Sequence, residues 1–298
     1  MSRLVCLGIL VKDIVFRVPH IPSTPQKLTC SAMRTQFGGM AATAAVAAAA
    51  LGGEVEFWGR VGDDPTGEEA ARALQQAGVK ARLEVSPGAQ SPLSAVMVDD
   101  AGERMLAVYT GQLDSSADWL PLDTLRTAGA VHADFRWVEG ARALYLAART
   151  CGIPRVLDAD AGNPQALREL TALADHIIFS ERGLADHAGD LPAEEALRQV
   201  AHAHGAVAGV TMGERGSLFC HDGHVQAFAA PRIKARDTNG AGDAFHGAYA
   251  LALTRGLDWR QAARYASAAA SLKCTRDHDW KHLPRHAEVM AFMESHPC

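Results

Sequence analysis

The residues best suited to chemistry form one short segment, Asp237-Thr-Asn-Gly-Ala-Gly-Asp243, which leads into an apolar stretch of helical period. Glycine permits a tight turn here, and the first free N–H groups of the following helix would point into that turn. The backbone N–H groups of Gly240, Ala241 and Gly242 would then form an anion hole. Asp243 could accept a proton from a hydroxyl that attacks a phosphoryl group. The alternative is that Asp243 only stabilises the helix dipole.

Two further glycine turns and one acid are candidates for ligand binding. Gly38-Gly39 precedes an alanine-rich stretch, Thr211-Met-Gly213-Glu-Arg-Gly216 follows an apolar run, and Asp13 follows the first such run. The glycines could equally be structural turns, and Asp13 a solvated turn residue. The chain has no Gly-x-x-x-x-Gly-Lys-Ser/Thr, which excludes a P-loop. It also lacks a strand-turn-helix Gly-x-Gly-x-x-Gly, which removes the main support for a dinucleotide oxidoreductase.

Short apolar runs alternate with segments of helical period along most of the chain. This alternation predicts parallel βαβ units and a sheet with helices on both faces. Strands are predicted at 4–8, 55–58, 130–133, 155–158, 176–179 and 206–211, and helices at 66–77, 140–150, 163–173 and 193–204.

Two stretches, 14–37 and 94–109, do not follow this alternation of strands and helices. The second contains Asp99-Asp-Ala-Gly102 between two apolar runs, which is a hairpin signal. Together the stretches predict a small antiparallel sheet, which is too small to be stable alone. We expect it to lie over the core as a lid or to pair with a second subunit. The simplest organisation is one domain over 1–298 with this lid, as a homodimer through the lid.

Composition narrows the function classes. The 298 residues carry 29 basic and 34 acidic side chains, and this net charge of −5 gives no general attraction to nucleic acid or to an anionic membrane. No apolar run approaches the roughly 20 residues of a membrane-spanning helix. The six cysteines are scattered singly, so neither a disulfide framework nor a zinc site is indicated. We expect a cytoplasmic protein that binds small molecules.

The segment Asp237 to Asp243, followed by Phe245, resembles the Asp-Thr-x-Gly-Ala-Gly-Asp-x-Phe signature of the ribokinase-like carbohydrate kinases, the PfkB family. The resemblance continues in the order of that family, through Gly8, Asp13, Gly38-Gly39, Gly59-Arg-Val-Gly-Asp-Asp64 and Thr211 to Gly216. It implies a three-layer αβα core with a mainly parallel sheet and a small antiparallel β lid.

The same resemblance implies roles for particular residues. Asp243 would be the catalytic base and Asp13 the sugar-binding acid, with Gly38 and Gly39 beside the sugar. ATP would be the phosphoryl donor with Mg²⁺, and the nucleotide would be bound by Thr211, Gly213, Gly216 and Lys273.

Several positions depart from the family pattern. Thr43 stands where many members have Asn, and the family's Asn-x-x-Glu is Ser180-Glu-Arg-Gly183, in which only Glu181 remains as an outer-sphere magnesium partner. The usual glycine-rich loop on the adenine side is replaced by the polar segment 273–284. How the adenine is held is therefore open.

Some of these departures resemble the sulfofructose kinase branch of the family, namely Ala133-Asp-Phe-Arg-Trp137 and Leu272-Lys-Cys-Thr-Arg276. In that branch Lys27 and Arg136 match positions of cations that hold a sulfonate. Lys27 could instead be a solvated lysine, and Arg136 part of a structural ion pair. An Asn associated with the same pocket would fall near Val108, so this chain lacks it.

The sequence thus predicts ATP-dependent phosphoryl transfer to a hydroxyl, preferably a primary one, of a small anionic ketose such as 6-deoxy-6-sulfofructose or a sugar phosphate. Two alternatives remain. One is a kinase for a neutral sugar or a sugar acid, such as fructose, ribose or 2-keto-3-deoxygluconate. The other is a non-catalytic sugar- or nucleotide-sensing protein of the same fold.

Overall fold

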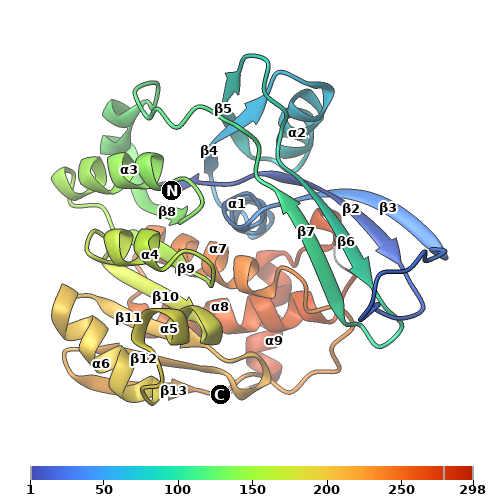
Figure 1. Cartoon of the computed structure of the whole chain (residues 1–298). Helices are drawn as coiled ribbons and strands as arrows, with labels where there is room; N and C mark the ends of the chain where they lie inside the picture. The colour runs from blue at the N-terminus through green and yellow to red at the C-terminus, as the bar shows by residue number, and fades with distance from the viewer. Residues whose placement is uncertain (1, 278, 297–298) are drawn as a thin grey trace.

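A computed structural model describes residues 2–277 and 279–296, and its largest feature is a nine-stranded sheet (Figure 1). The strand order is β13-β12-β11-β10-β9-β8-β1-β4-β5. The strands from β5 to β11 in this order pair in parallel, whereas β12 and β13 are antiparallel. The strands are β1 Arg3–Leu7, β4 Val55–Gly62, β5 Lys80–Ser86, β8 Ala128–Asp134, β9 Arg155–Ala159, β10 His176–Ser180, β11 Val207–Thr211, β12 Ser217–His221 and β13 His224–Phe228.

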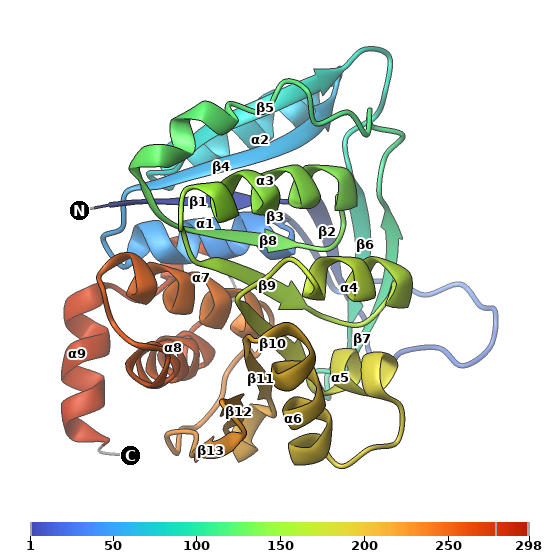
Figure 2. The same cartoon turned by 90° about the vertical axis from the view of Figure 1, so that its left-hand side faces the viewer.

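Helices cover both faces of this sheet because the strands are apolar on both faces. In β1, Leu4 and Cys6 pack into one hydrophobic cluster, while Val5 and Leu7 pack into the other. The first cluster contains α1 Met40–Ala50, α2 Pro65–Gln76, α7 Ala241–Thr254, α8 Trp259–Cys274 and α9 His286–Ser295. The second contains α3 Val138–Thr150, α4 Pro164–Thr171, α5 Glu181–Ala188 and α6 Ala193–His204, which lie in front of the sheet in Figure 2.

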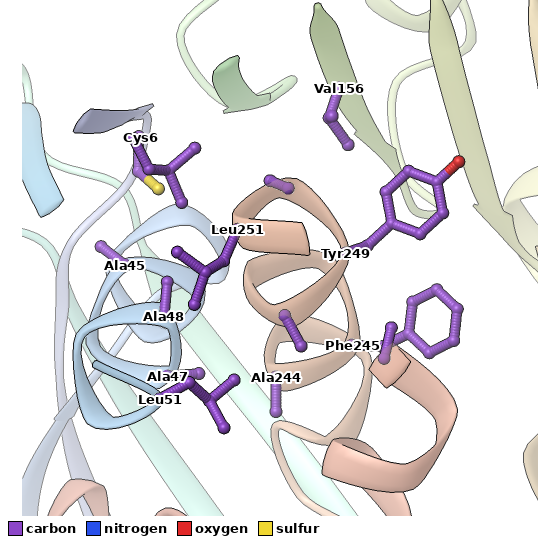
Figure 3. Packing of buried hydrophobic residues seen from close by; sticks show 14 of the residues in the cluster. Cys6, Ala45, Ala47, Ala48, Leu51, Val156, Ala244, Phe245, Tyr249 and Leu251 are labelled. Atoms are coloured by element: carbon purple, nitrogen blue, oxygen red, sulfur yellow. The ribbon is translucent and has the colours of Figure 1, made fainter. Parts of the chain in front are cut away.

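Small residues bring α1 and α7 close together. Figure 3 shows Leu251 of α7 pointing toward α1, where it lies near Ala48. A Cβ atom on Gly247 of α7 would lie 2.1 Å from the backbone oxygen of Ala44, so only glycine allows this approach. This packing fixes α7, whose first turn carries Asp243.

The second sheet has four strands in the order β3-β2-β6-β7 and lies beside the core (Figure 1). β2 pairs antiparallel with β3 and parallel with β6, and β6 pairs antiparallel with β7. Its strands are β2 Val11–Arg17, β3 Ala32–Gly38, β6 Leu93–Val98 and β7 Arg104–Tyr109, and the remaining elements of the chain are the 3₁₀ turns η1 Leu122–Thr127, η2 Gly213–Arg215 and η3 Trp280–His282.

The predicted α/β fold class is confirmed: a large, mainly parallel sheet lies between two helical layers, with a smaller, mostly antiparallel sheet attached. The stretches 14–37 and 94–109 fall on this smaller sheet, although β2 begins earlier, at Val11. None of the helices that the structure describes has the length and apolar character to cross a bilayer.

Candidate active site

The turn between Thr238 and α7 has the shape of an anion-binding site. Gly240, the N-cap residue of α7, has a left-handed φ of 69°, which favours glycine. No side chain caps this helix terminus, so its N–H groups are available to a ligand. A Cβ on Gly242 would meet nothing within 4 Å, because this side of the turn is open. Of the predicted donors, the N–H of Ala241 already contacts the oxygen of Thr238 at 3.2 Å.

Asp243 lines a cavity of about 590 Å³ between α7, the strand ends and the small sheet. Burial, and next the negative charge of Asp158, raise the pKa of Asp243 well above that of an ordinary aspartate. The nearby His246, one turn further along α7, contacts the oxygen of Gly242 at 2.8 Å through Nδ1. A carboxylate with a raised pKa binds a proton more readily, which suits a general base.

The carboxyl ends of the core strands add acids that the sequence reasoning missed. Asp134 at the end of β8 accepts hydrogen bonds from the N–H groups of Ile9 (2.9 Å) and Ala41 (3.1 Å), so it joins β1 to the start of α1. Asp158, near the end of β9, and Asp160, directly after it, also line the cavity. Asp158 Oδ2 is buried and makes no hydrogen bond to a described residue. The available signal was the position of these acids, directly after apolar strands.

The small sheet forms the opposite wall. Asp13 of β2 lines the cavity, and its carboxylate accepts a hydrogen bond from Ser94 of β6. Burial raises the pKa of Asp13, although the hydrogen bonds from Ser94 and Gln36 lower it. Gly39 has a φ of 100°, and a Cβ there would lie 2.4 Å from the oxygen of Ile9. The structure therefore brings Asp13 and the Gly38-Gly39 turn together with Asp243 around one cavity.

The two predicted cations have different surroundings. Arg136 lines the cavity and stacks 4.5 Å from the ring centroid of Phe135. Its guanidinium forms no ion pair with any residue in the described part of the chain, so the alternative of a structural ion pair is not observed. Lys27 lies exposed in the β2–β3 loop, which Figure 2 shows projecting outward, and it does not line the cavity. The predicted convergence of Lys27 and Arg136 is absent from this conformation.

Arg104 is a third cation, which the sequence reasoning missed. It lies on β7 and lines the same cavity as Asp243. Its guanidinium donates to Asn239 Oδ1 at 2.9 Å and lies 3.3 Å from Thr238 Oγ1 and 3.5 Å from Asp237 Oδ1. Arg104 therefore connects the small sheet to the glycine turn of the core. No local pattern identifies it, since the contacts join residues more than 130 positions apart.

A second cavity, of about 880 Å³, lies on the other side of the turn. Thr211, Gly213 and Gly216 line it, as predicted for a nucleotide site, together with small residues of α8 and the segment 230–235. Gly216 is required at its position because a Cβ would lie 2.0 Å from the oxygen of Phe228. The two cavities share Thr211, Thr238, Ala241 and Gly242, so they meet at the glycine turn before α7.

Two predicted nucleotide-side residues are placed differently. Lys273 is buried and does not line the large cavity, because its ammonium donates to the backbone oxygens of Asp237 and Asn239. Glu181 is half-exposed and forms an ion pair with Arg215. In the atypical segment 273–284, the indole N–H of Trp280 donates to Thr43 Oγ1 at 3.2 Å, at the edge of the smaller cavity.

Comparisons with known proteins agree with this architecture. The model of the pfkB family carbohydrate kinases matches residues 1–281. A fructokinase of Vibrio alginolyticus is 30% identical over 240 residues, which is 75% of this chain and 78% of the relative. The crystal structure of an Agrobacterium tumefaciens protein provisionally named a ribokinase superposes with a TM-score of 0.93 at 32% identity, covering 99% of this chain and 98% of that one.

The fold also matches Arabidopsis thaliana ribokinase, solved with ribose and ATP, with a TM-score of 0.84 at 24% identity and coverage of 98% and 99% of the two chains. This chain belongs to the pfkB family of carbohydrate kinases. It is an ATP-dependent sugar kinase of the ribokinase and fructokinase type.

Proposed function

We propose that this kinase transfers the γ-phosphoryl group of ATP to a hydroxyl, preferably a primary one, of a small anionic ketose such as 6-deoxy-6-sulfofructose or a sugar phosphate. One observation carries the proposal: the two cavities meet at Ala241 and Gly242, with Asp243 on the side of the smaller cavity. The nucleotide would occupy the larger cavity and the sugar the smaller one. The transferring group would then lie against the anion-binding turn.

Asp243 would act as the base in this reaction. The sugar hydroxyl forms the new bond to the γ-phosphorus, the bond from that phosphorus to the oxygen of the leaving ADP breaks, and the hydroxyl proton passes to the Asp243 carboxylate. The free N–H groups of the turn and the dipole of α7 would stabilise the charge on the transferring group. Burial supports this arrangement, because electrostatic interactions are stronger away from water.

We propose that Mg²⁺ accompanies the nucleotide and neutralises its phosphates. The chemistry of the site fits a hard cation: Asp160 lines the smaller cavity, and Asp158 Oδ2 is buried there with no hydrogen-bond partner among the described residues, 3.4 Å from His246 Nδ1. Carboxylate oxygens are ligands that Mg²⁺ prefers. Glu181, held by Arg215 at the start of α5, would act through water as an outer-sphere partner.

The proposal of an anionic substrate rests on Arg136. Its guanidinium lines the sugar cavity, and no carboxylate among the described residues neutralises it by an ion pair. Arg104 lines the same cavity but is already engaged by the turn. A sulfonate or phosphate on the sugar would supply the missing partner of Arg136. Lys27 would contribute only if its loop folded inward over the cavity.

The smaller sheet is proposed to be a lid on a single kinase domain. Its residues Asp13 and Ser94 already face the cavity, and the exclusion of water there would favour transfer to the sugar over hydrolysis. Exposed apolar side chains on the lid, namely Met33 and Met105, support pairing with a second copy. We therefore propose a homodimer through the lid, which light scattering of the purified protein would test.

A neutral sugar is the second candidate, because the Vibrio alginolyticus relative is a fructokinase. A coupled assay of ADP release separates the candidates. Its panel would hold fructose, ribose, 2-keto-3-deoxygluconate, fructose 6-phosphate and 6-deoxy-6-sulfofructose. We expect the highest kcat/KM for an anionic ketose. Equal or higher kcat/KM for plain fructose or ribose would reject the anionic substrate, and no ADP release with any sugar would favour a sensing role.

Arg136→Ala tests the cation directly. Loss of a charged hydrogen bond costs roughly 1.5–3 kcal/mol, so kcat/KM for the anionic sugar should fall about 10- to 150-fold. The value for a neutral sugar should hardly change. Arg142→Ala, which removes a partly exposed arginine paired with Glu169 on the outer helices, is the matched control. An equal fall in kcat/KM for every sugar would mean that Arg136 has only a structural role. Lys27→Ala in the same assay reports whether its loop closes.

A further inference from the structure

The anion-binding turn is held from behind by the end of α8. The N–H groups of Arg236 and Asp237 donate to the oxygen of Cys274, at 2.8 and 3.1 Å. Lys273, the preceding residue, directs its ammonium to the oxygens of Asp237 and Asn239. The last turn of α8 thus contacts three of the residues that lead into Gly240, namely Arg236, Asp237 and Asn239.

The Lys273 ammonium has an unusual environment. Only 3% of the residue is exposed, and lysine is almost never buried unless its charge is compensated. Here the compensation comes from two backbone oxygens, from the negative end of the α8 dipole and from nearby carboxylates, Asp237 and Asp243. Burial lowers its pKa, and the charge of Arg104 acts in the same direction.

We propose that Lys273 is a positioning residue whose buried ammonium acts as a built-in cation that holds the anion-binding turn in its active shape. This rests on the proposed function, in which the opposite side of the turn binds the transferring group. The backbone oxygens of Asp237 and Asn239 carry partial negative charges and would repel one another without a cation between them. With the ammonium present they point together toward α8, and the N–H groups at the start of α7 remain free for the ligand.

The role differs from that of a nucleotide ligand. A ligand would line the large cavity, and its loss would raise KM for ATP. Lys273 lies outside that lining. Its loss should disorder the turn and lower kcat while KM for the sugar stays nearly constant. Misplacement of catalytic groups by about 1 Å can cost 100-fold, so a fall in kcat of about 10- to 100-fold is expected.

The experiment compares Lys273→Met with Lys281→Met, a matched change at an exposed lysine in the same C-terminal segment. Hydrogen exchange of the amides at 236–242 is the readout that does not depend on activity. We expect faster exchange there in Lys273→Met and no change in Lys281→Met. Normal exchange together with normal kcat would overturn the proposal. Normal exchange with a raised KM for ATP would make Lys273 a nucleotide ligand.

Chemical rescue separates charge from packing. In Lys273→Ala, added ethylammonium should occupy the vacated space between the two oxygens and restore both slow exchange and part of kcat, whereas tetramethylammonium, which cannot donate, should not. If the other variants fail to fold, Lys273→Gln replaces them in the comparison, because its side-chain amide can still donate hydrogen bonds but carries no charge. A folded Lys273→Gln with the kcat and exchange of wild type would overturn the role of the charge. If wild type phosphorylated no sugar, the proposed function would fail while the exchange data still decided the role of Lys273.

Discussion

In the nine-stranded sheet, Phe57 and Trp58 are fully buried on opposite faces, whereas in the four-stranded sheet Met33 and Leu106 are 62% and 56% exposed. The difference follows from coverage: two helical layers enclose the first sheet, and no helical layer in the described part of the chain encloses the second. The enclosed sheet holds Asp243, the strand-end acids and the anion-binding turn in fixed geometry. The open sheet contributes Asp13 and Arg104 across the cavity. The enclosed sheet therefore carries the proposed base and Arg136, while the exposed sheet supplies the opposite wall of the cavity.

The largest effect should come from the core residue Asp243. Asp243→Asn keeps the size of the side chain but removes the proton acceptor, so kcat should fall about 10²- to 10⁴-fold. The melting temperature should not fall, because the change removes a partly buried charge whose pKa desolvation had raised. Steady-state ADP release and thermal unfolding measure the two properties. Asp186→Asn, on the exposed side of α5, is the control, and more than about a tenth of wild-type kcat in Asp243→Asn would disprove the base assignment.

A second effect concerns the pH dependence of core stability. Burial lowers the pKa of His132 to about 3, and the ring is fully buried without a hydrogen-bond partner among the described residues. Unfolded histidine titrates near 6.5, so between these values the unfolded state binds more protons. The contribution of neutral, buried His132 to the free energy of unfolding is therefore complete above about pH 6.5. It is lost as the pH falls below that value, by about 1.4 kcal/mol per pH unit.

The variant His132→Leu isolates this contribution. Buried carboxylates with raised pKa, such as Asp158, change stability in the opposite direction, so the quantity to compare is the difference between wild type and variant. Urea unfolding at pH 7, 6 and 5 should show a free energy of unfolding that declines more steeply on acidification in wild type. Parallel curves for the two proteins would mean that His132 is not buried as a neutral ring.

A smaller effect should distinguish the packed core from the exposed four-stranded sheet by the loss of stability that a substitution causes. Gly247→Ala places a methyl group 2.1 Å from the backbone oxygen of Ala44, where α1 and α7 are in contact. Overpacking of this kind costs about 1–3 kcal/mol of unfolding free energy. Leu106→Ser, at a 56% exposed position of β7 on the rim of the smaller cavity, should stay within about 0.5 kcal/mol of wild type. Urea unfolding of both variants tests the contrast, and equal losses would contradict it.

The smallest effect is expected in the lid itself. If β6 and β7 close over the sugar, hydrogen exchange at 93–98 and 104–109 should slow when the cognate sugar is added, by more than in the core strand β1. Arg104→Gln should reduce this protection, because it removes the contacts to Thr238 and Asn239. Protection confined to the core would show that the sheet does not respond to the substrate.

Much of the fold could be predicted from periodicity, but certain strands could not. β5, with the sequence Lys-Ala-Arg-Leu-Glu-Val-Ser, lies at the edge of the sheet, and its charged residues hide the apolar pattern. The β12–β13 hairpin was missed although Asp222-Gly223 is a hairpin signal, because its strands are short and contain histidines. Edge positions tolerate polar residues, so local patterns are weakest there.

The sequence by itself determined the reaction class through a resemblance: the contiguous segment Asp237 to Asp243 matches the PfkB signature. The shape of that segment, with its glycine turn and free helix N–H groups, follows from local backbone chemistry. Only the tertiary structure decided which distant residues surround that segment. It brought Arg104 and Asp158 to the cavity, left Lys27 exposed and directed Lys273 to the back of the turn. The physical reason is that a turn is specified by its own few residues, whereas contacts between the lid, α8 and the strand ends depend on how the whole chain packs.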